Sequence, residues 1–499
     1  MSSPAEIPYR SLIQINNNST LPVYRQIAER IIDSVQRGYL SAGLRLPGTR
    51  ILAKILGLHR NTIVAAYEEL EKQEWVETIP NKGTVLLHGM HKSPVKIRTD
   101  KATSTASYPN AAGFTFSQTN ILDNPFELSD CDYVLNDGSP DIRLIQISDL
   151  SQRYSANLKR KSNRKKLSGY NQEGSEYFKA NLCNYLNLSR GLHISGKNLL
   201  ITRSTEMSVY ITSRILLAQG DLVLVGTLGY FSVNMILQKN GARIQTVPID
   251  NDGIDVDYIQ RICEKQQVRM VYITPHHHYP TTVTLSPQRR MQLLNLAAEY
   301  GFVILEDDYD YDFHYNKSPV LPLCSADHKG MVVYIGALGK SLAPGFRTGF
   351  IVAPENLMAE MRKYLGIIDR QGDILMEQVL GEMIEDGEIH RYMRKSLKVY
   401  QERRDHLAAL LSQYLADEVE FELPSGGLAV WLKWKKQINL FQLSKSCEKN
   451  NLFIPKTLLY QDKHTSAMRL GFGNLSKEEM ETCISIIHKC LPTALIRTS

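Results

Sequence analysis

The chain has 499 residues, of which 43% are hydrophobic and 22% charged, a formal net charge of +6 and seven cysteines that never occur in CxxC spacing. This composition is typical of a soluble globular protein, and at roughly 150 residues per domain the length predicts two or three domains. No apolar run approaches the roughly 18 residues of a membrane span, and the N-terminus lacks a secretory signal pattern, so we expect a cytoplasmic protein with reduced thiols and no membrane association.

Three short helices are expected near the N-terminus. Apolar residues recur at helical spacing over 21–39, a second helix is expected over 49–56, and a third follows over 61–70 after a short turn. Two short helices joined by a tight turn that contains glycine are typical of a helix-turn-helix. Two β-rich runs, 75–79 and 83–87, then predict a hairpin or wing.

The local charge of this segment favours DNA binding. Between Asp33 and Glu68 the sequence has no acidic residue and five basic ones, namely Arg37, Arg45, Arg50, Lys54 and Arg60. Concentrated positive charge suits phosphate contacts, and Arg or Asn at the start of a recognition helix can bind base edges. The alternative is a three-helix module that binds protein.

Residues 21–87 resemble the GntR-type winged helix. The resemblance rests on Leu-Pro-Gly-Thr-Arg at 46–50, on Leu-His-Arg-Asn-Thr-Ile at 58–63 and on Tyr-Glu-Glu-Leu at 67–70. It implies DNA contacts by Arg50, Arg60, Asn61 and Thr62, and by Lys82 and Gly83 in the wing.

The composition changes after the wing. Residues 89–125 are rich in Ser, Thr, Ala, Lys and Pro and keep no amphipathic period. They predict a flexible linker between a DNA-binding domain over 11–88 and a larger domain over 126–499. The densest basic run of the chain, 159–166, lies in that larger domain. Such a run is usually a solvated face, and the alternative is a second contact with DNA phosphates.

From residue 126 onward, helical stretches alternate with short apolar runs. Five runs are candidate buried strands: 199–202, 222–225, 270–274, 302–305 and 331–335. Helical stretches such as 289–300 separate several of them. This alternation predicts an α/β fold with a mainly parallel sheet, helices on both faces, and ligands at the carboxyl ends of the strands.

Residues that suit pyridoxal 5'-phosphate (PLP) follow these strands. A lysine amine, here Lys340, can form a Schiff base with an aldehyde, and a carboxylate such as Asp307 can keep the ring nitrogen protonated. Helix N-terminal amides and an arginine bind phosphate well. The remaining candidates are Ser204, Thr205 and Arg347 for the phosphate and Tyr230 for the ring face. Each residue alone has an ordinary structural explanation, but their order and positions together favour a cofactor site.

Residues 130–499 resemble the fold-type I aminotransferases. The matching segments are 137–141, 274–281, 305–310, 336–340, 347–350 and 468–472. The resemblance implies that Lys340 forms the Schiff base, that Asp307 meets the pyridine nitrogen and that Tyr309 meets the ring hydroxyl. It further implies Tyr230 on the ring face, Arg347 on the phosphate, Tyr170 on the phosphate of a partner subunit, and Arg469 on the carboxylate of an amino-acid ligand.

A winged helix joined to an aminotransferase-like domain resembles the MocR/GabR subfamily of GntR regulators. The resemblance implies a homodimeric transcriptional regulator that binds an operator and senses PLP, or an amino-acid or amine effector, through Schiff-base chemistry. One alternative is an active PLP-dependent aminotransferase with an attached DNA-binding module. Another is a repressor that binds no cofactor.

The triplet His276-His277-His278 raises the question of a metal site. Alternate residues of an extended loop face opposite ways, and the sequence places no carboxylate or cysteine cluster beside the triplet. We therefore expect no metal there, and a polar loop that lines the cofactor pocket.

Overall fold

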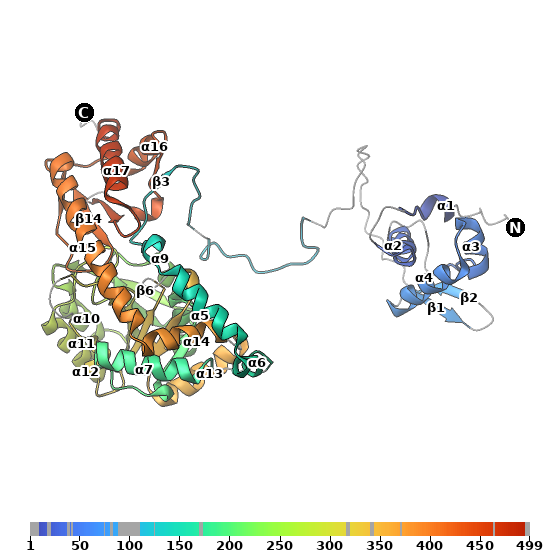
Figure 1. The fold of residues 1–499 in the computed structure, drawn as a ribbon, viewed down its shortest axis with the longest axis horizontal. Helices are drawn as coiled ribbons and strands as arrows, with labels where there is room; N and C mark the ends of the chain where they lie inside the picture. Colours follow the sequence, from blue (N-terminus) through green and yellow to red (C-terminus); the bar gives the residue numbers. More distant parts are fainter. Residues whose placement is uncertain are drawn as a thin grey trace. The chain divides into compact units, whose positions relative to one another are not determined.

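The computed structural model describes residues 9–16, 21–36, 40, 43–73, 75–79, 83–87, 110–123, 125–168, 173–315, 320–339, 344–369, 372–462 and 465–494. Three predicted site residues, Lys82, Tyr170 and Lys340, lie outside the described residues. The chain divides into two compact units, Met1–Thr115 and Phe116–Ser499, called here the N-terminal unit and the large unit (Figure 1).

The N-terminal unit is a helical bundle with a short hairpin. Its elements are α1 (Tyr9–Leu12), α2 (Val23–Gln36), α3 (Thr49–Leu56), α4 (Arg60–Lys72), β1 (Val76–Ile79) and β2 (Gly83–Leu86). Ile27, Leu52 and Ile63, one from each long helix, are fully buried against one another. Gly57, with φ of +68°, ends α3 in a left-handed conformation that glycine adopts without strain. β1 and β2 pair antiparallel, so the predicted helix-turn-helix and hairpin are confirmed.

The large unit is built on a seven-stranded sheet. The strands are β4 (Leu199–Thr202), β5 (Leu222–Gly226), β6 (Arg243–Val247), β9 (Met270–Ile273), β10 (Val303–Asp308), β11 (Val332–Ala337) and β12 (Gly349–Val352). Their order is β4-β12-β11-β10-β9-β5-β6, and only β12 runs antiparallel to its neighbours. All five predicted strands are present. β6 and β12 were not predicted.

The two faces of this sheet carry separate hydrophobic clusters, because successive strand residues point to opposite faces. One face packs against α8 (Thr205–Leu216), α9 (Phe231–Lys239) and α13 (Glu355–Ile368). The other packs against α7 (Glu176–Arg190), α10 (Val256–Cys263) and α11 (Pro287–Tyr300). Along β5, for example, Leu222 and Leu224 belong to the second cluster, whereas Val223 and Val225 belong to the first.

The C-terminal part of the large unit holds a second, antiparallel sheet. Its strands are β13 (Val419–Phe421), β14 (Ala429–Trp434), β16 (Leu459–Gln461) and β17 (Ser466–Gly471), with α15 (Glu388–Leu415), α16 (Leu440–Glu448) and α17 (Lys477–Cys490) beside them. The smaller elements are β3 (Tyr133–Val134), β7 (Ile249–Asp250), β8 (Gly253–Ile254), β15 (Leu452–Phe453) and α12 (Leu323–Ala326).

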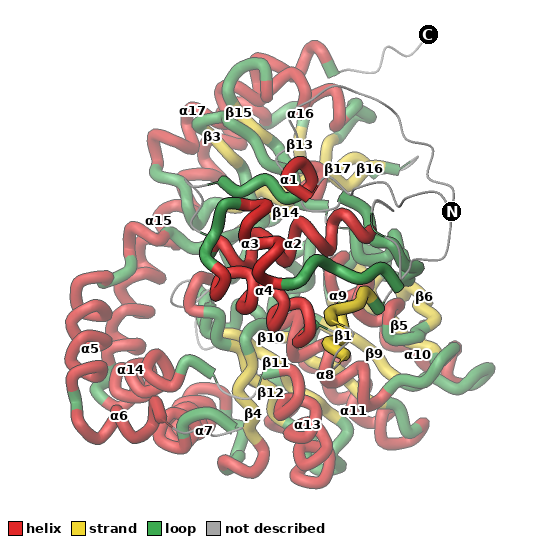
Figure 2. The backbone as a smooth tube through the Cα atoms, turned by 90° about the vertical axis from the view of Figure 1, so that its right-hand side faces the viewer, coloured by secondary structure: helices red, strands yellow, loops and turns green. Residues whose placement is uncertain are grey.

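A group of helices lies at one edge of the large unit. It consists of α5 (Ile147–Lys159), α6 (Lys161–Ser168) and α14 (Ile374–Glu385), which lie side by side in both views (Figures 1 and 2). All seven cysteines are free. Among the described residues, no helix combines the length and the apolar character that crossing a membrane requires.

Candidate cofactor site and DNA-binding surface

A cavity of about 130 Å³ lies at the carboxyl ends of the central strands. The described residues that line it are Asp137, Thr205, Glu206, Tyr230, Tyr272, Thr274, Tyr279, Asp307, Tyr309 and Ala337. Its volume is close to the roughly 150 Å³ of a protein cavity that binds benzene, so the space suits a six-membered aromatic ring. The structure therefore brings together four of the predicted cofactor residues: Asp307, Tyr309, Tyr230 and Thr205.

Asp307, at the end of β10, is buried and only half satisfied. Its Oδ2 accepts a hydrogen bond from the Tyr272 hydroxyl at 2.8 Å, whereas its Oδ1 has no partner. Burial raises the pKa of Asp307 to about 8; the bond from Tyr272 opposes this shift, and the negative charges of Asp308 and Glu206 add to it. The raised pKa favours the protonated acid at pH 7, and a cationic N–H beside the free oxygen would favour the carboxylate instead.

Tyr309 and Arg469 form a bonded pair beside the cavity. The Tyr309 hydroxyl donates to the carbonyl of His277 at 2.9 Å and accepts from an Arg469 N–H at 3.3 Å. Arg469 also donates to the carbonyl oxygens of Asp137 and Pro280, at 2.9 and 2.7 Å. It is 1% exposed and is not among the described residues that line the cavity. Within the described residues, three of its five N–H donors are therefore engaged.

Negative charge lies at the N-terminus of α8. The Ser204 hydroxyl accepts a hydrogen bond from the Met207 amide at 3.2 Å and so caps the helix. The next two residues, Thr205 and Glu206, line the cavity, and the Tyr230 hydroxyl donates to Glu206 at 3.4 Å. Helix N-termini attract anions, and here Glu206 already supplies one. Of the predicted pair Ser204 and Thr205, only Thr205 lines this cavity.

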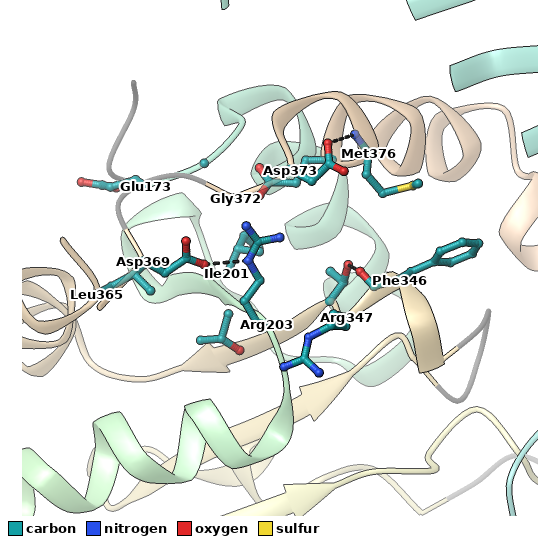
Figure 3. Close-up of a pocket in the computed structure, with 14 residues that line it drawn as sticks. Glu173, Ile201, Arg203, Phe346, Arg347, Leu365, Asp369, Gly372, Asp373 and Met376 are labelled. Atoms are coloured by element: carbon teal, nitrogen blue, oxygen red, sulfur yellow. Dashed lines mark hydrogen bonds and ion pairs between the residues drawn. The ribbon is translucent and has the colours of Figure 1, made fainter. Parts of the chain in front are cut away.

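Arg347 lines a second pocket instead of the ring-sized cavity (Figure 3). It shares this pocket with Arg203, which points toward Asp369 and pairs with it at 2.6 Å. Arg347 has φ of +45°, in the left-handed region that a side chain rarely adopts. Glu377 also lines the pocket, and burial raises its pKa to about 7. Arg203, Asp369 and Glu377 were not predicted as site residues.

The histidine triplet has carboxylate partners. His276 Nδ1 lies 3.0 Å from Asp308, and His277 Nδ1 lies 2.8 Å from Asp310. Our expectation that no carboxylates accompany the triplet is wrong, because β10 and the loop after it carry acids that the sequence pattern does not place beside residues 276–278. Within the described ranges, no group of three His, Cys, Asp or Glu residues has the geometry of a metal site.

Those acids are part of an acidic segment, residues 306–312. Its five carboxylates, Glu306, Asp307, Asp308, Asp310 and Asp312, are all buried. Arg190, itself 1% exposed, reaches from α7 to pair with Asp312 and to donate to the Tyr334 hydroxyl. Although burial raises the pKa of Asp308, His276 and Arg190 lower it below the ordinary value. The acidic segment is therefore stabilised by cations from distant parts of the chain.

The predicted DNA-contacting residues gather at the starts of α3 and α4. Arg50, Arg60 and Asn61 are exposed and Thr62 is half-buried. Arg60 donates to the Thr49 hydroxyl at 3.5 Å, which holds the two helix starts together. Before α4, the His59 side chain accepts from the Asn61 amide.

In the hairpin, Gly83 has φ of +90°. A Cβ at this position would lie 2.9 Å from the guanidinium of Arg45, so glycine lets that cation lie against the wing. Of the two predicted wing residues, Gly83 lies at the start of β2, whereas Lys82 lies outside the described residues.

Two family models match the chain. The model for aminotransferase class I and II matches residues 146–487, and the model for bacterial regulatory proteins of the gntR family matches residues 23–86. The chain therefore belongs to the aminotransferase class I and II family and carries a GntR DNA-binding domain at its N-terminal end.

Curated relatives share this combination over most of their length. The chain is 25% identical to the probable rhizopine catabolism regulatory protein MocR of Rhizobium meliloti, over 86% of this chain and 85% of that protein. It is 24% identical to the HTH-type transcriptional regulator NorG of Staphylococcus aureus, over 89% of this chain and 99% of that protein. Its architecture is that of the MocR-type regulators, as predicted.

Solved structures confirm the fold of the large unit. An archaeal alanine:glyoxylate aminotransferase superposes with a TM-score of 0.67 and 26% identity, and the match covers 72% of this chain and 90% of that chain. A multiple substrate aminotransferase from Thermococcus profundus superposes with the same TM-score at 23% identity, covering 73% and 92%. The predicted mainly parallel α/β fold of the fold-type I aminotransferases is confirmed.

Proposed function

We propose that this protein is a cytoplasmic, homodimeric transcriptional regulator that responds to PLP. A DNA-binding domain over 11–88 binds an operator, residues 89–125 link it to the rest, and the domain over 126–499 senses PLP or an amine or amino-acid effector. The observation that carries this proposal is Asp307: a buried acid with one unpartnered oxygen in a cavity large enough for an aromatic ring. A homodimer matches the two half-sites of most operators.

The residues present fit PLP. Asp307 Oδ1 would accept from the protonated ring nitrogen, and Tyr309 and Tyr230 would contact the ring. Ala337, which lines the cavity, ends β11 three residues before Lys340, so Lys340 would supply the amine. Bound PLP supplies an aldehyde that can pass between amines. The phosphate contacts would come from Ser204, Thr205 and Arg347, with Tyr170 of the partner subunit, and the effector carboxylate would meet Arg469.

The cavity is connected to the antiparallel sheet of the large unit. Tyr309 donates to the carbonyl of His277, and the His277 ring packs against Gly426, where a Cβ would lie 2.3 Å from Nε2. Asp310, the partner of His277, similarly packs against Gly427. These contacts would let a change at Tyr309 be transmitted to β14, which begins two residues after Gly427. A switch needs only that PLP or the effector binds two such arrangements with different affinity.

Lys340→Ala tests the proposal. We expect the parent to develop a visible absorbance band with PLP and to change its operator affinity when PLP or an amine is added, because Lys340 forms the covalent bond. The variant should lack the band and bind the operator with one affinity under all conditions. Lys329→Ala, an exposed lysine on a loop, is the matched control. The proposal fails if operator binding by Lys340→Ala responds to PLP and amine as the parent does.

An active aminotransferase is the second candidate, because Asp307, Lys340 and Arg469 would also permit half a transamination. Steady-state turnover with a keto-acid acceptor distinguishes the two functions. Turnover at rates typical of enzymes, roughly 1–10³ s⁻¹, would favour the enzyme, whereas its absence alongside a PLP-dependent operator affinity would favour the regulator.

Asn61→Ala tests the DNA-binding surface. Asn61 is exposed at the start of α4, the helix that enters the major groove in a helix-turn-helix. Losing one side chain that reads a base costs about 1–3 kcal/mol, so we expect operator affinity to fall roughly 5- to 150-fold. Glu68→Ala, on the same helix, should leave the affinity unchanged. Fluorescence anisotropy with labelled operator measures both, and equal losses in the two variants would contradict the assignment.

A further inference from the structure

The basic run at 159–166 forms a corner between two helices. α5 ends at Lys159, the chain turns at Arg160, and α6 begins at Lys161. The segment 157–168 contains six basic residues and no acidic one. In Figure 2, α5 and α6 lie together at one edge of the large unit.

Two buried asparagines hold the corner in shape. Asn163 donates to both the backbone and the side-chain oxygen of Asn157, each at 3.0 Å. Asn157 in turn donates to the Arg153 carbonyl at 3.1 Å and to Glu382 of α14 at 2.9 Å. Asn157 and Asn163 are 0% and 3% exposed. The basic side chains therefore project from a backbone that is fixed against the body of the large unit.

Two of the six cations already have partners. Arg160 pairs with Glu382 at 2.5 Å, and Lys166 donates to the side chain of Gln378 at 2.8 Å. The nearby carboxylates of α5 and α14 are also engaged, since Asp149 and Asp386 both bind Arg153. These carboxylates are therefore already paired, and within the described residues they form no ion pair with the outward-facing cations.

The remaining four cations, Lys159, Lys161, Arg164 and Lys165, define what we call the basic corner. All four are exposed, and none has an ion pair within the part of the chain that the structure describes. Lys161, Arg164 and Lys165 stand three and four residues apart, so they share one face of α6. Like charges at this spacing destabilise a helix by a few tenths of a kcal/mol per pair, and a bound polyanion would reverse that effect.

We propose that the basic corner is a second DNA-binding surface, which contacts phosphates of duplex DNA outside the site bound by the winged helix. The chain carries a GntR DNA-binding domain, so binding of that domain to its operator raises the local concentration of flanking DNA phosphates around the large unit. Lysine and arginine side chains on a rigid support contact the backbone without reading sequence, as phosphate-binding residues do. The corner therefore adds affinity that depends on DNA length and salt.

The test compares two DNA fragments and one triple variant. One fragment contains the operator alone. The other adds about 40 base pairs on each side, roughly 136 Å at 3.4 Å per base pair, which is close to the greatest span of the 37 residues at 89–125, about 133 Å at 3.6 Å per residue. The variant is Lys161→Gln/Arg164→Gln/Lys165→Gln, which removes charge but keeps helix-forming side chains.

For the parent we expect tighter binding to the long fragment and a steeper dependence of affinity on salt. Each lost phosphate contact reduces the slope of log K against log salt by about 0.9, so the triple variant should lose about 2 to 3 for each basic corner that contacts the long fragment. On the short fragment the variant should bind like the parent, which shows that the winged helix is intact.

The matched control removes three exposed lysines elsewhere on the large unit, as Lys445→Gln/Lys449→Gln/Lys489→Gln. This control changes net charge equally and should keep the slope of the parent on both fragments. An unchanged slope for the basic-corner variant on long DNA overturns the proposal, as does an equal loss in the control. Loss of binding to the short fragment alone would instead count against the winged helix as the operator-binding domain.

Discussion

Asp307→Asn is expected to lower the affinity for PLP roughly 10- to 150-fold. The aspartate oxygen that has no partner is placed to accept from a protonated ring nitrogen, and a hydrogen bond to a charged group contributes about 1.5–3 kcal/mol. Asparagine keeps the size of the side chain and its bond to Tyr272 but cannot carry the negative charge. Titration of the purified protein with PLP, followed by absorbance, measures the change.

The neighbouring acid provides the control. Asp308 lies next to Asp307, is equally buried, and does not line the described part of the cavity. Its pKa is held below the ordinary value by His276 and Arg190, so it is ionised at neutral pH. Asp308→Asn should therefore destabilise the protein and leave PLP affinity close to that of the parent. Equal PLP affinities for the parent and Asp307→Asn would show that Asp307 does not contact the ring.

Asp307→Asn is also expected to change how the free energy of unfolding depends on pH in the absence of PLP. Burial raises the pKa of folded Asp307 to about 8 from an ordinary value of 3.8, so between these values the folded state holds a proton that the unfolded state has released. The free energy of unfolding then decreases as pH rises through this window, by at most about 1.4 kcal/mol per pH unit for one proton. Asp307→Asn lacks this contribution. Its unfolding midpoint should fall less than that of the parent between pH 5 and pH 8.

Arg190→Met is expected to destabilise the large unit by about 3–5 kcal/mol. Arg190 is fully buried and pairs with Asp312, and removing one partner of a buried ion pair leaves an uncompensated charge. Urea denaturation followed by circular dichroism measures the loss. Arg391→Met, on an exposed arginine paired with Glu388, should change stability by less than about 1 kcal/mol.

A second substitution tests the cause. If the loss comes from the unpaired carboxylate, the double variant Arg190→Met/Asp312→Asn should recover part of the stability that the single variant loses. No recovery would mean that Arg190 acts through packing against the aromatic rings of Tyr311 and Phe350, which its guanidinium approaches within 4.6 and 5.7 Å.

The sequence predicts the sheet well where strands are buried on both faces. β5 and β9 are uninterrupted apolar runs with all residues buried, and both are predicted. β6 is missed because it is an edge strand, and only Val247 of its five residues is buried. β12 is also missed, although its four residues are all buried and it is as long as the predicted β9.

The site is predictable in part for a related reason. Asp307 and Tyr309 follow a predicted strand and must lie at the ligand-binding edge of the sheet. The partner of Asp307 could not be predicted, because it depends on strand order and register. In the pairing of β10 with β9, Leu305 lies opposite Tyr272. Asp307 is two residues beyond Leu305, so its side chain lies on the same face of the sheet as Tyr272 and accepts a hydrogen bond from the Tyr272 hydroxyl. The sequence does place Ser204 at the start of a helix, but it does not show that the Ser204 hydroxyl is engaged by the Met207 amide.

The acidic segment at 306–312 requires the large unit to fold as a whole, because its partners come from distant parts of the chain. Its side chains are partnered by Arg190, 122 residues earlier than Asp312, and by His276 and His277 from the loop after β9. A nascent chain that ends before residue 306 has these partners without their acids, and one that starts after residue 278 has the acids without these partners. Desolvating either set alone is unfavourable. A fragment boundary between residues 190 and 312 should therefore leave two pieces that cannot complete their cores, whereas a boundary near residue 115 separates two units that each contain their own buried partners.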